Sequence, residues 1–222
     1  MTTLPKNQSL QDLHRAVGEA ISEWTAVEIQ VYQIFGITLS LTARQPGGGW
    51  SGTSTGPSAV LNAIESFQTK LKLVTAALKD ALSHDGGQFS SESAVIIDVW
   101  LKLEKRVNRL SQNRNKLAYW TTASSVGKRG KARVGLIPPP YSSKYQDFVA
   151  DRLQAVTETD VSDWKSSFRA LAIELIDFAG RLAGYRELQY KHVGQMLEQC
   201  LVSLPQDRTL IEFVQSKLRV SR

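Results

Sequence analysis

The amino-acid sequence predicts an all-α protein, a helical bundle of four main helices with a β-hairpin-like excursion after the third helix and extra C-terminal helices. Three observations predict this fold: four long segments with apolar residues at helical spacing, turn-forming residues between them, and one pair of β-favouring runs. The chain has 222 residues, of which 42% are hydrophobic and 22% charged. These values are typical of globular proteins and exclude collagen-like, mucin-like and disordered chains.

Each expected helix carries one apolar stripe whose steps are three and four residues. The first two stripes consist of Leu10, Leu13, Val17, Ile21, Trp24, Val27, Val31 and Phe35, and of Val60, Ile64, Phe67, Leu71, Val74 and Leu78. The third and fourth consist of Ile96, Trp100, Leu103, Val107, Leu110, Arg114 and Leu117, and of Val161, Trp164, Phe168, Leu171, Leu175, Phe178 and Leu182. Helices with one such stripe bury it against each other, which favours a bundle.

Local signals place the ends of these helices. Pro57 suits the first turn of the second helix, and Asp160 suits the N-cap of the fourth. Residues 42–58 are rich in Gly, Ser and Thr and are expected to form a flexible loop, and residues 85–87 a turn. The organisation is therefore one domain over residues 1–222, with a bundle core at 10–185.

The segment after the third helix has a different pattern. Two β-favouring runs, residues 118–126 and 131–137, flank a Gly-Lys-Arg-Gly sequence at 127–130, which predicts a hairpin. Three prolines at 138–140 then prevent a continuing helix, so residues 121–159 are expected to form a hairpin and Pro-rich excursion with a short helix at about 148–153. Residues 186–222 are expected to form a C-terminal extension of two amphipathic helices, one before and one after Pro205.

The positive charge is concentrated in one part of the chain. Residues 102–152 contain 12 Lys and Arg and three acids, whereas the remaining residues contain 15 basic and 18 acidic side chains. A concentrated basic surface attracts phosphate backbones. The alternative is that these cations only solvate the surface of a helix and a turn. The candidate nucleic-acid-binding residues are Arg106, Arg109, Lys116, Lys128, Arg129, Lys131 and Arg133.

Arg114 departs from the apolar pattern of the third helix, because it occupies a position in the stripe. A desolvated guanidinium needs a carboxylate, a bound anion or a polar interface around it. One interpretation is a structural salt bridge that fixes the helix register, with Glu28 of the first helix as the candidate partner. The other is an anion-binding arginine at the mouth of the bundle.

The residues SQNRNKLAYW at 111–120 resemble the Arg-Asn-x-x-x-His signature of the HEPN superfamily. The context is also similar: Trp24 and Glu28 on the first helix, the motif at the end of the third helix, and a β-like excursion before another long helix. The resemblance covers roughly residues 10–185. It implies a small, commonly dimeric helical bundle, and many active members are metal-independent ribonucleases. It also implies catalytic roles for Arg114 and Asn115, and an antitoxin or nucleotidyltransferase partner of toxin–antitoxin type.

Tyr119 stands where the family pattern has its histidine. Imidazole accepts a proton near neutral pH, whereas a phenol with a reference pKa of about 10 stays protonated at pH 7. The three histidines, His14, His84 and His192, lie outside any recognisable metal or catalytic motif and are expected to have structural or solvated roles. We therefore expect a catalytically degenerate site in which Tyr119 binds phosphate or stacks on a base.

Three functions follow as hypotheses. The first is a HEPN-like, dimeric RNA- or phosphate-binding protein with a degenerate site. The second is a metal-independent ribonuclease of toxin or defence type with a modified site at Arg114, Asn115 and Tyr119. The third is a helical protein-interaction module without a nucleic-acid role. No metal, cofactor or membrane association is expected, and the lone Cys200 favours a cytoplasmic location.

Overall fold

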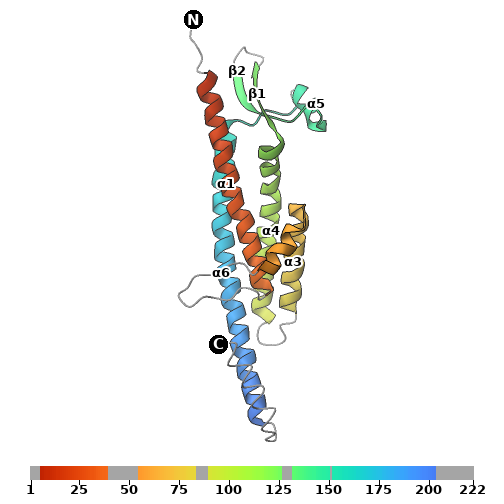
Figure 1. Ribbon diagram of the computed structural model, residues 1–222, viewed down its shortest axis with the longest axis vertical. Helices are drawn as coiled ribbons and strands as arrows, with labels where there is room; N and C mark the ends of the chain where they lie inside the picture. Colours follow the sequence, from red (N-terminus) through yellow and green to blue (C-terminus); the bar gives the residue numbers. More distant parts are fainter. Residues whose placement is uncertain (1–5, 40–54, 84–89, 127–131, 151, 204–222) are drawn as a thin grey trace. The chain divides into compact units, whose positions relative to one another are not determined.

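The computed structural model describes residues 6–39, 55–83, 90–126, 132–150 and 152–203 (Figure 1). The elements in this part of the chain are α1 (Lys6–Thr38), α2 (Thr55–Asn62), α3 (Phe67–Ser83), α4 (Ser90–Tyr119), β1 (Thr121–Val126), β2 (Ala132–Ile137), α5 (Ser143–Val149) and α6 (Glu158–Ser203). The mostly helical content, with one small hairpin after the third main helix, confirms the predicted all-α bundle.

The chain divides into two compact units, residues 1–182 and 183–222. The first unit contains α1 to α5 and the part of α6 up to Leu182. The described part of the second unit is the remainder of α6. No described helix is both long enough and apolar enough to span a membrane.

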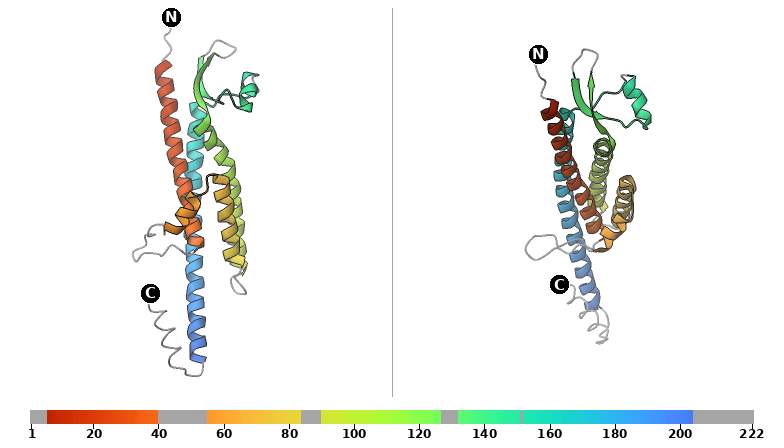
Figure 2. Two further views of the ribbon diagram at one scale, coloured as in Figure 1. Left: turned by 45° about the vertical axis from the view of Figure 1, so that its right-hand side comes forward. Right: turned by 45° about the horizontal axis from the view of Figure 1, so that its top comes forward.

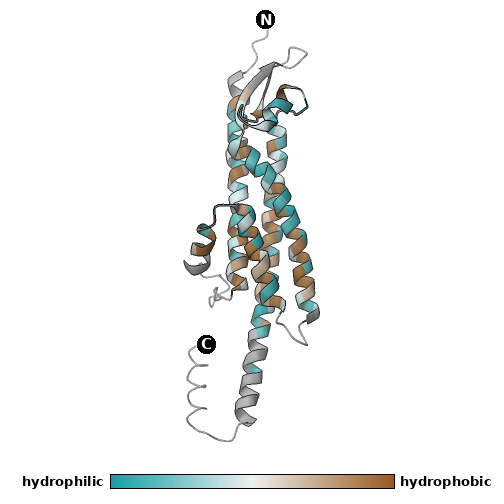
Figure 3. Cartoon of the chain, turned by 90° about the vertical axis from the view of Figure 1, so that its right-hand side faces the viewer, coloured by the Kyte–Doolittle hydropathy of each residue, from teal (hydrophilic) through white to brown (hydrophobic). Residues whose placement is uncertain are grey.

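The core of the first unit is built around two buried indoles. Trp24 of α1 packs edge-on against Phe67 and Phe168, with ring centroids 5.3 and 5.1 Å away. Trp100 of α4 is fully buried and lies 5.5 Å from Phe178 of α6. Apolar residues alternate with hydrophilic ones along each helix (Figure 3), and the apolar positions of the predicted stripes supply most of this core.

Ion pairs fix the directions of the long helices. Lys165 of α6 pairs with Glu19 of α1 at 2.8 Å, and Arg169 pairs with Glu23 at 2.6 Å. Both contacts have the same sequence offset, so α1 and this part of α6 run parallel, as Figure 2 shows. α4 runs antiparallel to both. Its end lies beside the middle part of α1, where Arg114 approaches Glu28, and near the beginning of α6, where Lys116 contacts Trp164 (Figure 1).

The hairpin and α5 lie at this same end of the first unit, where α4 finishes (Figures 1 and 2). β1 and β2 pair antiparallel from Thr121 opposite Ile137 to Val126 opposite Ala132. Leu136 also exchanges two backbone hydrogen bonds with Val156, which ties the hairpin to the segment that leads into α6. The hairpin prediction is confirmed.

The second predicted helix is interrupted, which corrects the expectation of one continuous stripe. α2 ends at Asn62 and α3 begins at Phe67, and the Ser66 Oγ accepts the backbone N–H of Thr69 as a cap. α2 buries Leu61 completely, whereas the predicted stripe residue Val60 is 49% exposed. A side-chain cap that competes with helical hydrogen bonds explains the break.

Other helix limits also differ from the predictions. Thr157, and not Asp160, is the N-cap of α6: the Thr157 Oγ accepts the N–H of Asp160, whose carboxylate accepts from the Thr157 N–H and hydroxyl. This is a reciprocal capping box. The predicted short helix at 148–153 is α5, which begins five residues earlier at Ser143. The tail helix before Pro205 is continuous with α6, and residues 55–58 of the expected loop belong to α2.

In the first stripe, Ile21 is 42% exposed and Ala20 is buried in its place. Four expectations lie outside the described residues: the rest of the flexible loop, the turn at 85–87, the hairpin tip, and the helix after Pro205.

Candidate nucleic-acid interface

Arg114 lies on the last turns of α4, between the buried residues Leu110 and Leu117. The apolar stripe of α4, of which Trp100 is also a member, carries Arg114 toward α1, as the sequence pattern predicts. Its side chain is nevertheless 37% exposed, and one guanidinium nitrogen lies 4.0 Å from Glu28 of α1. The predicted partner is therefore present, within the same chain and at the limit of an ion pair. The guanidinium keeps a solvent-accessible face.

Glu28 has a second and closer partner. Its Oε1, the same atom that faces Arg114, accepts the indole N–H of Trp24 at 2.7 Å. Trp24 is 2% exposed, so this carboxylate satisfies a buried donor that has no access to water. Glu28 thus interacts with both a core indole and Arg114, so it compensates the positive charge of Arg114 only in part.

The other two motif residues are at the surface. Asn115 is exposed, and its side-chain oxygen accepts a long hydrogen bond of 3.5 Å from Arg114. Tyr119 is 64% exposed at the end of α4. In the described part of the chain no histidine is hydrogen-bonded to any of the three motif residues; the exposed His14 lies 3.4 Å from Thr122 of β1. The described groups that contact Arg114 are a carboxylate and an amide, and none of them is an imidazole.

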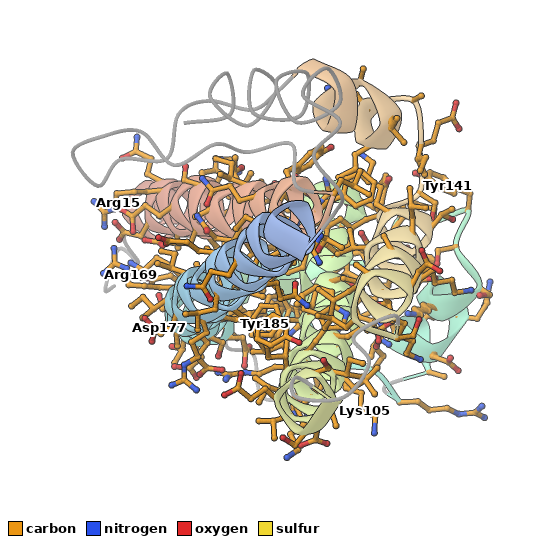
Figure 4. All side chains as sticks on the ribbon, turned by 90° about the horizontal axis from the view of Figure 1, so that it is seen from below. Arg15, Lys105, Tyr141, Arg169, Asp177 and Tyr185 are labelled. Carbon is orange, nitrogen blue, oxygen red and sulfur yellow. The ribbon has the colours of Figure 1, made fainter. Side chains whose placement is uncertain are left out.

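The predicted basic residues of α4 divide into paired and unpaired cations. Arg106 forms a two-oxygen ion pair with Glu174 of α6, so its charge is neutralised within the bundle. Arg109 is exposed and forms no ion pair with a described residue. Lys105, one helical turn before it, is likewise exposed and unpaired, and it lies at an outer edge of the bundle in Figure 4. These two cations form an outward basic ridge on α4, which we name the α4 ridge.

The predicted hairpin cations cannot be placed in the same way. Lys128, Arg129 and Lys131 lie outside the described residues, and only the backbone of Arg133 is described, in β2. The strands leave the end of α4, so the hairpin that carries these four residues begins next to the motif (Figure 1).

Lys116 occupies a different environment from the other cations. Its Nζ lies 5.4 Å from the ring centroid of Trp120 and 5.2 Å from that of Trp164, so two indoles contact one ammonium group. Burial lowers the pKa of Lys116, and the nearby charge of Lys144 lowers it further, while Asp160 acts in the opposite direction. We call Lys116, Trp120, Trp164 and Lys144 the Trp–Lys cluster.

Sequence reasoning missed three members of this cluster. Trp164 was expected only as a stripe residue of the core, and Trp120 was only the last letter of the motif segment. Lys144 lies on α5, whose position relative to the bundle no periodicity reveals. The available signal was a tryptophan, Trp120, four residues after Lys116 at the end of a basic helix.

Among the described residues, no group of three or more His, Cys, Asp or Glu side chains is arranged to hold a metal ion. Comparison of the chain with family models, with curated proteins and with solved structures finds no match.

Proposed function

We propose that this chain is a HEPN-like, dimeric and cytoplasmic protein that binds RNA through the basic surface of α4 and the adjoining hairpin, and that its catalytic motif is degenerate. The α4 ridge carries the proposal. Lys105 and Arg109 project from the bundle without an acidic partner in the described part of the chain. Unpaired surface cations are free to replace the counterions of a phosphate backbone.

The motif supports a binding role better than a catalytic one. Arg114 keeps an exposed face, and Asn115 and Tyr119 are at the surface beside it. Cleavage of RNA at neutral pH needs a proton acceptor, and the described groups that contact Arg114 are a carboxylate and an amide. One oxygen of the carboxylate already accepts the indole N–H of Trp24, and none of the described groups that contact Arg114 is an imidazole. We therefore assign these residues to phosphate contact.

The decisive test compares two doubly neutralised variants with the same net charge. Lys105→Gln with Arg109→Gln removes the unpaired α4 ridge. Lys102→Gln with Arg152→Gln removes two exposed cations that already have partners, Asp98 and Asp147. Binding to a labelled single-stranded RNA is measured by anisotropy over a series of salt concentrations.

We expect the ridge variant to bind more weakly and to lower the slope of log K against log salt by about 1.4, since each phosphate contact contributes about 0.7 for a single strand. The control variant should keep the wild-type slope. Equal losses in the two variants would show that only net charge matters. No binding by the wild type at low salt would reject the proposal.

The degenerate motif has its own test. We expect neither the wild type nor Tyr119→Ala to have ribonuclease activity. Tyr119→His restores the imidazole of the family pattern. Cleavage of labelled RNA in EDTA by the wild type, abolished by Arg114→Ala, would instead support the ribonuclease hypothesis. The dimer is checked by sedimentation velocity of the full chain, for which a concentration-independent monomer is the contrary result.

A further inference from the structure

The Trp–Lys cluster joins four separate parts of the first unit at the hairpin end. Lys116 is in the last turn of α4, and Trp120 follows that helix directly. Lys144 is on α5, and Trp164 is near the beginning of α6. The proposed contact of RNA with the basic surface of α4 and the hairpin does not require the two indoles. The position of the two indoles around Lys116 therefore calls for a separate explanation.

The two indoles of the cluster differ from the two indoles of the core. Trp24 and Trp100 are buried, and each donates its N–H to a protein acceptor, Glu28 or Thr75. Trp120 and Trp164 are only half-buried, and within the described residues neither indole N–H is hydrogen-bonded. An amphipathic ring with an exposed surface and a free donor is suited to contact with a ligand.

The charges of the cluster are not balanced by the protein. Lys116 and Lys144 form no ion pair with a described residue, and they repel each other. The acid that acts on Lys116 is Asp160, whose carboxylate already accepts two hydrogen bonds from Thr157 at 2.8 and 2.6 Å. An anion bound by the two ammonium groups would offset their repulsion and would stabilise the charged form of Lys116, which burial disfavours.

We propose that the Trp–Lys cluster is a subsite for one unpaired nucleotide of single-stranded RNA, whose base stacks on Trp120 or Trp164 and whose phosphate contacts Lys116 and Lys144. This inference rests on the proposed function and specifies its substrate class. Aromatic platforms beside a basic groove bind single strands because every unpaired base exposes a π-face, whereas the bases of a duplex are already stacked.

The experiment measures the affinity of the full chain for a labelled oligouridine of about ten nucleotides and for an RNA duplex of the same length. The wild type should prefer the single strand. Trp120→Ala should weaken single-strand binding roughly five- to hundredfold, the range expected for one stacked base. Trp120→Phe, which retains a ring, should keep most of the affinity. Duplex binding should change little in either variant.

Two controls separate stacking from general effects. Tyr141→Ala removes an aromatic ring that is 88% exposed and lies outside the cluster, and it should leave the affinity unchanged. Lys116→Gln should weaken oligouridine binding without unfolding the chain, since it removes a charge that burial disfavours and keeps a polar side chain at this half-buried position. Circular dichroism confirms that each variant is folded. Trp120→Ala should shift the whole salt plot downward and keep its slope, because stacking releases no counterions.

The outcomes distinguish this inference from the function on which it rests. Unchanged oligouridine affinity in Trp120→Ala and Lys116→Gln, together with a loss in the α4 ridge variant, would overturn the subsite and leave RNA binding intact. Equal affinity for duplex and single strand would also overturn it. So would displacement of the oligonucleotide by a polyglutamate peptide of equal charge as effectively as by unlabelled oligouridine. Failure of any RNA to bind at low salt rejects both proposals.

Discussion

Substitution of Glu28 tests how one carboxylate serves both the core and Arg114. Glu28→Gln removes the charge and keeps an oxygen that can accept the indole N–H of Trp24. Glu28→Leu removes both. Because the two partners share the same Oε1, at 2.7 and 4.0 Å, the pair of variants separates the hydrogen bond from the ion pair. The unfolding free energy of each variant follows from urea titration.

The geometry sets the expected magnitudes. Two unit charges at 4.0 Å would interact by about 4 kcal/mol at an effective dielectric constant of about 20. Arg114 and Glu28 are each about one third exposed, so solvent screening reduces this to about 1 kcal/mol or less. A hydrogen bond to a charged group contributes about 1.5–3 kcal/mol, and roughly half of that survives with a neutral acceptor. We expect a loss of about 1–2 kcal/mol for Glu28→Gln and about 2–4 kcal/mol for Glu28→Leu.

The RNA affinity of the same variants tests the functional part of the reasoning. Glu28→Gln removes the negative charge beside Arg114, so RNA should bind up to about fivefold more tightly if Arg114 contacts a phosphate. An unchanged affinity would place Arg114 away from the RNA. Equal destabilisation by Glu28→Gln and Glu28→Leu would refute the role of Glu28 as the acceptor for the buried indole of Trp24.

Three further predictions concern the fold that positions the site. Thr75→Val leaves the fully buried indole N–H of Trp100 without its acceptor and should lower the unfolding free energy by about 1–3 kcal/mol, whereas Thr38→Val, also buried but bonded only to its own helix, should change it little; urea titration measures both. The lysine partner of Glu19 lowers the pKa of that carboxyl below 4.5, so the stability difference between the wild type and Glu19→Gln should be present near neutral pH and vanish as the pH falls through the lowered pKa, in titrations down to about pH 3. Gly135→Ala places a Cβ 2.8 Å from a backbone oxygen of the segment before α6, and thermal unfolding should detect a loss of about 1–3 kcal/mol; an unchanged melting temperature would mean that the hairpin shifts freely.

The sequence predicted those features that depend on helical periodicity. The stripe of α4 placed Arg114 toward the bundle interior, and the position of Glu28 on the first stripe made it the candidate partner; the structure confirms this contact. The hairpin followed from two β-favouring runs around glycines. In each case the apolar residues recur with a period of two residues in a strand or near four in a helix. This recurrence is a property of the sequence and does not depend on tertiary packing.

Features that depend on competition between side-chain caps and helical hydrogen bonds, or on tertiary contacts, could not be predicted from periodicity. The apolar spacing from Val60 to Phe67 continues through the break between α2 and α3. A cap at Ser66 changes the backbone hydrogen bonds but not this spacing, so periodicity does not reveal the break. The Trp–Lys cluster depends on how the start of α6 brings Trp164 to Lys116 and how α5 brings Lys144 within electrostatic reach of Lys116, and these paths are determined by packing. Whether Arg109 is paired depends on which acids of other helices lie near it.

The parallel arrangement of α1 and α6 has a consequence for synthesis of the chain. The contacts that join these helices, such as Lys165 with Glu19, are separated by 146 residues. At ribosomal rates of roughly 5–20 residues per second, roughly 7–30 s pass between the synthesis of the first and of the second residue of each contact. During that time the face of α1 that α6 covers in the folded chain is without this partner, so the packing of α1 is completed only after α6 has been synthesised.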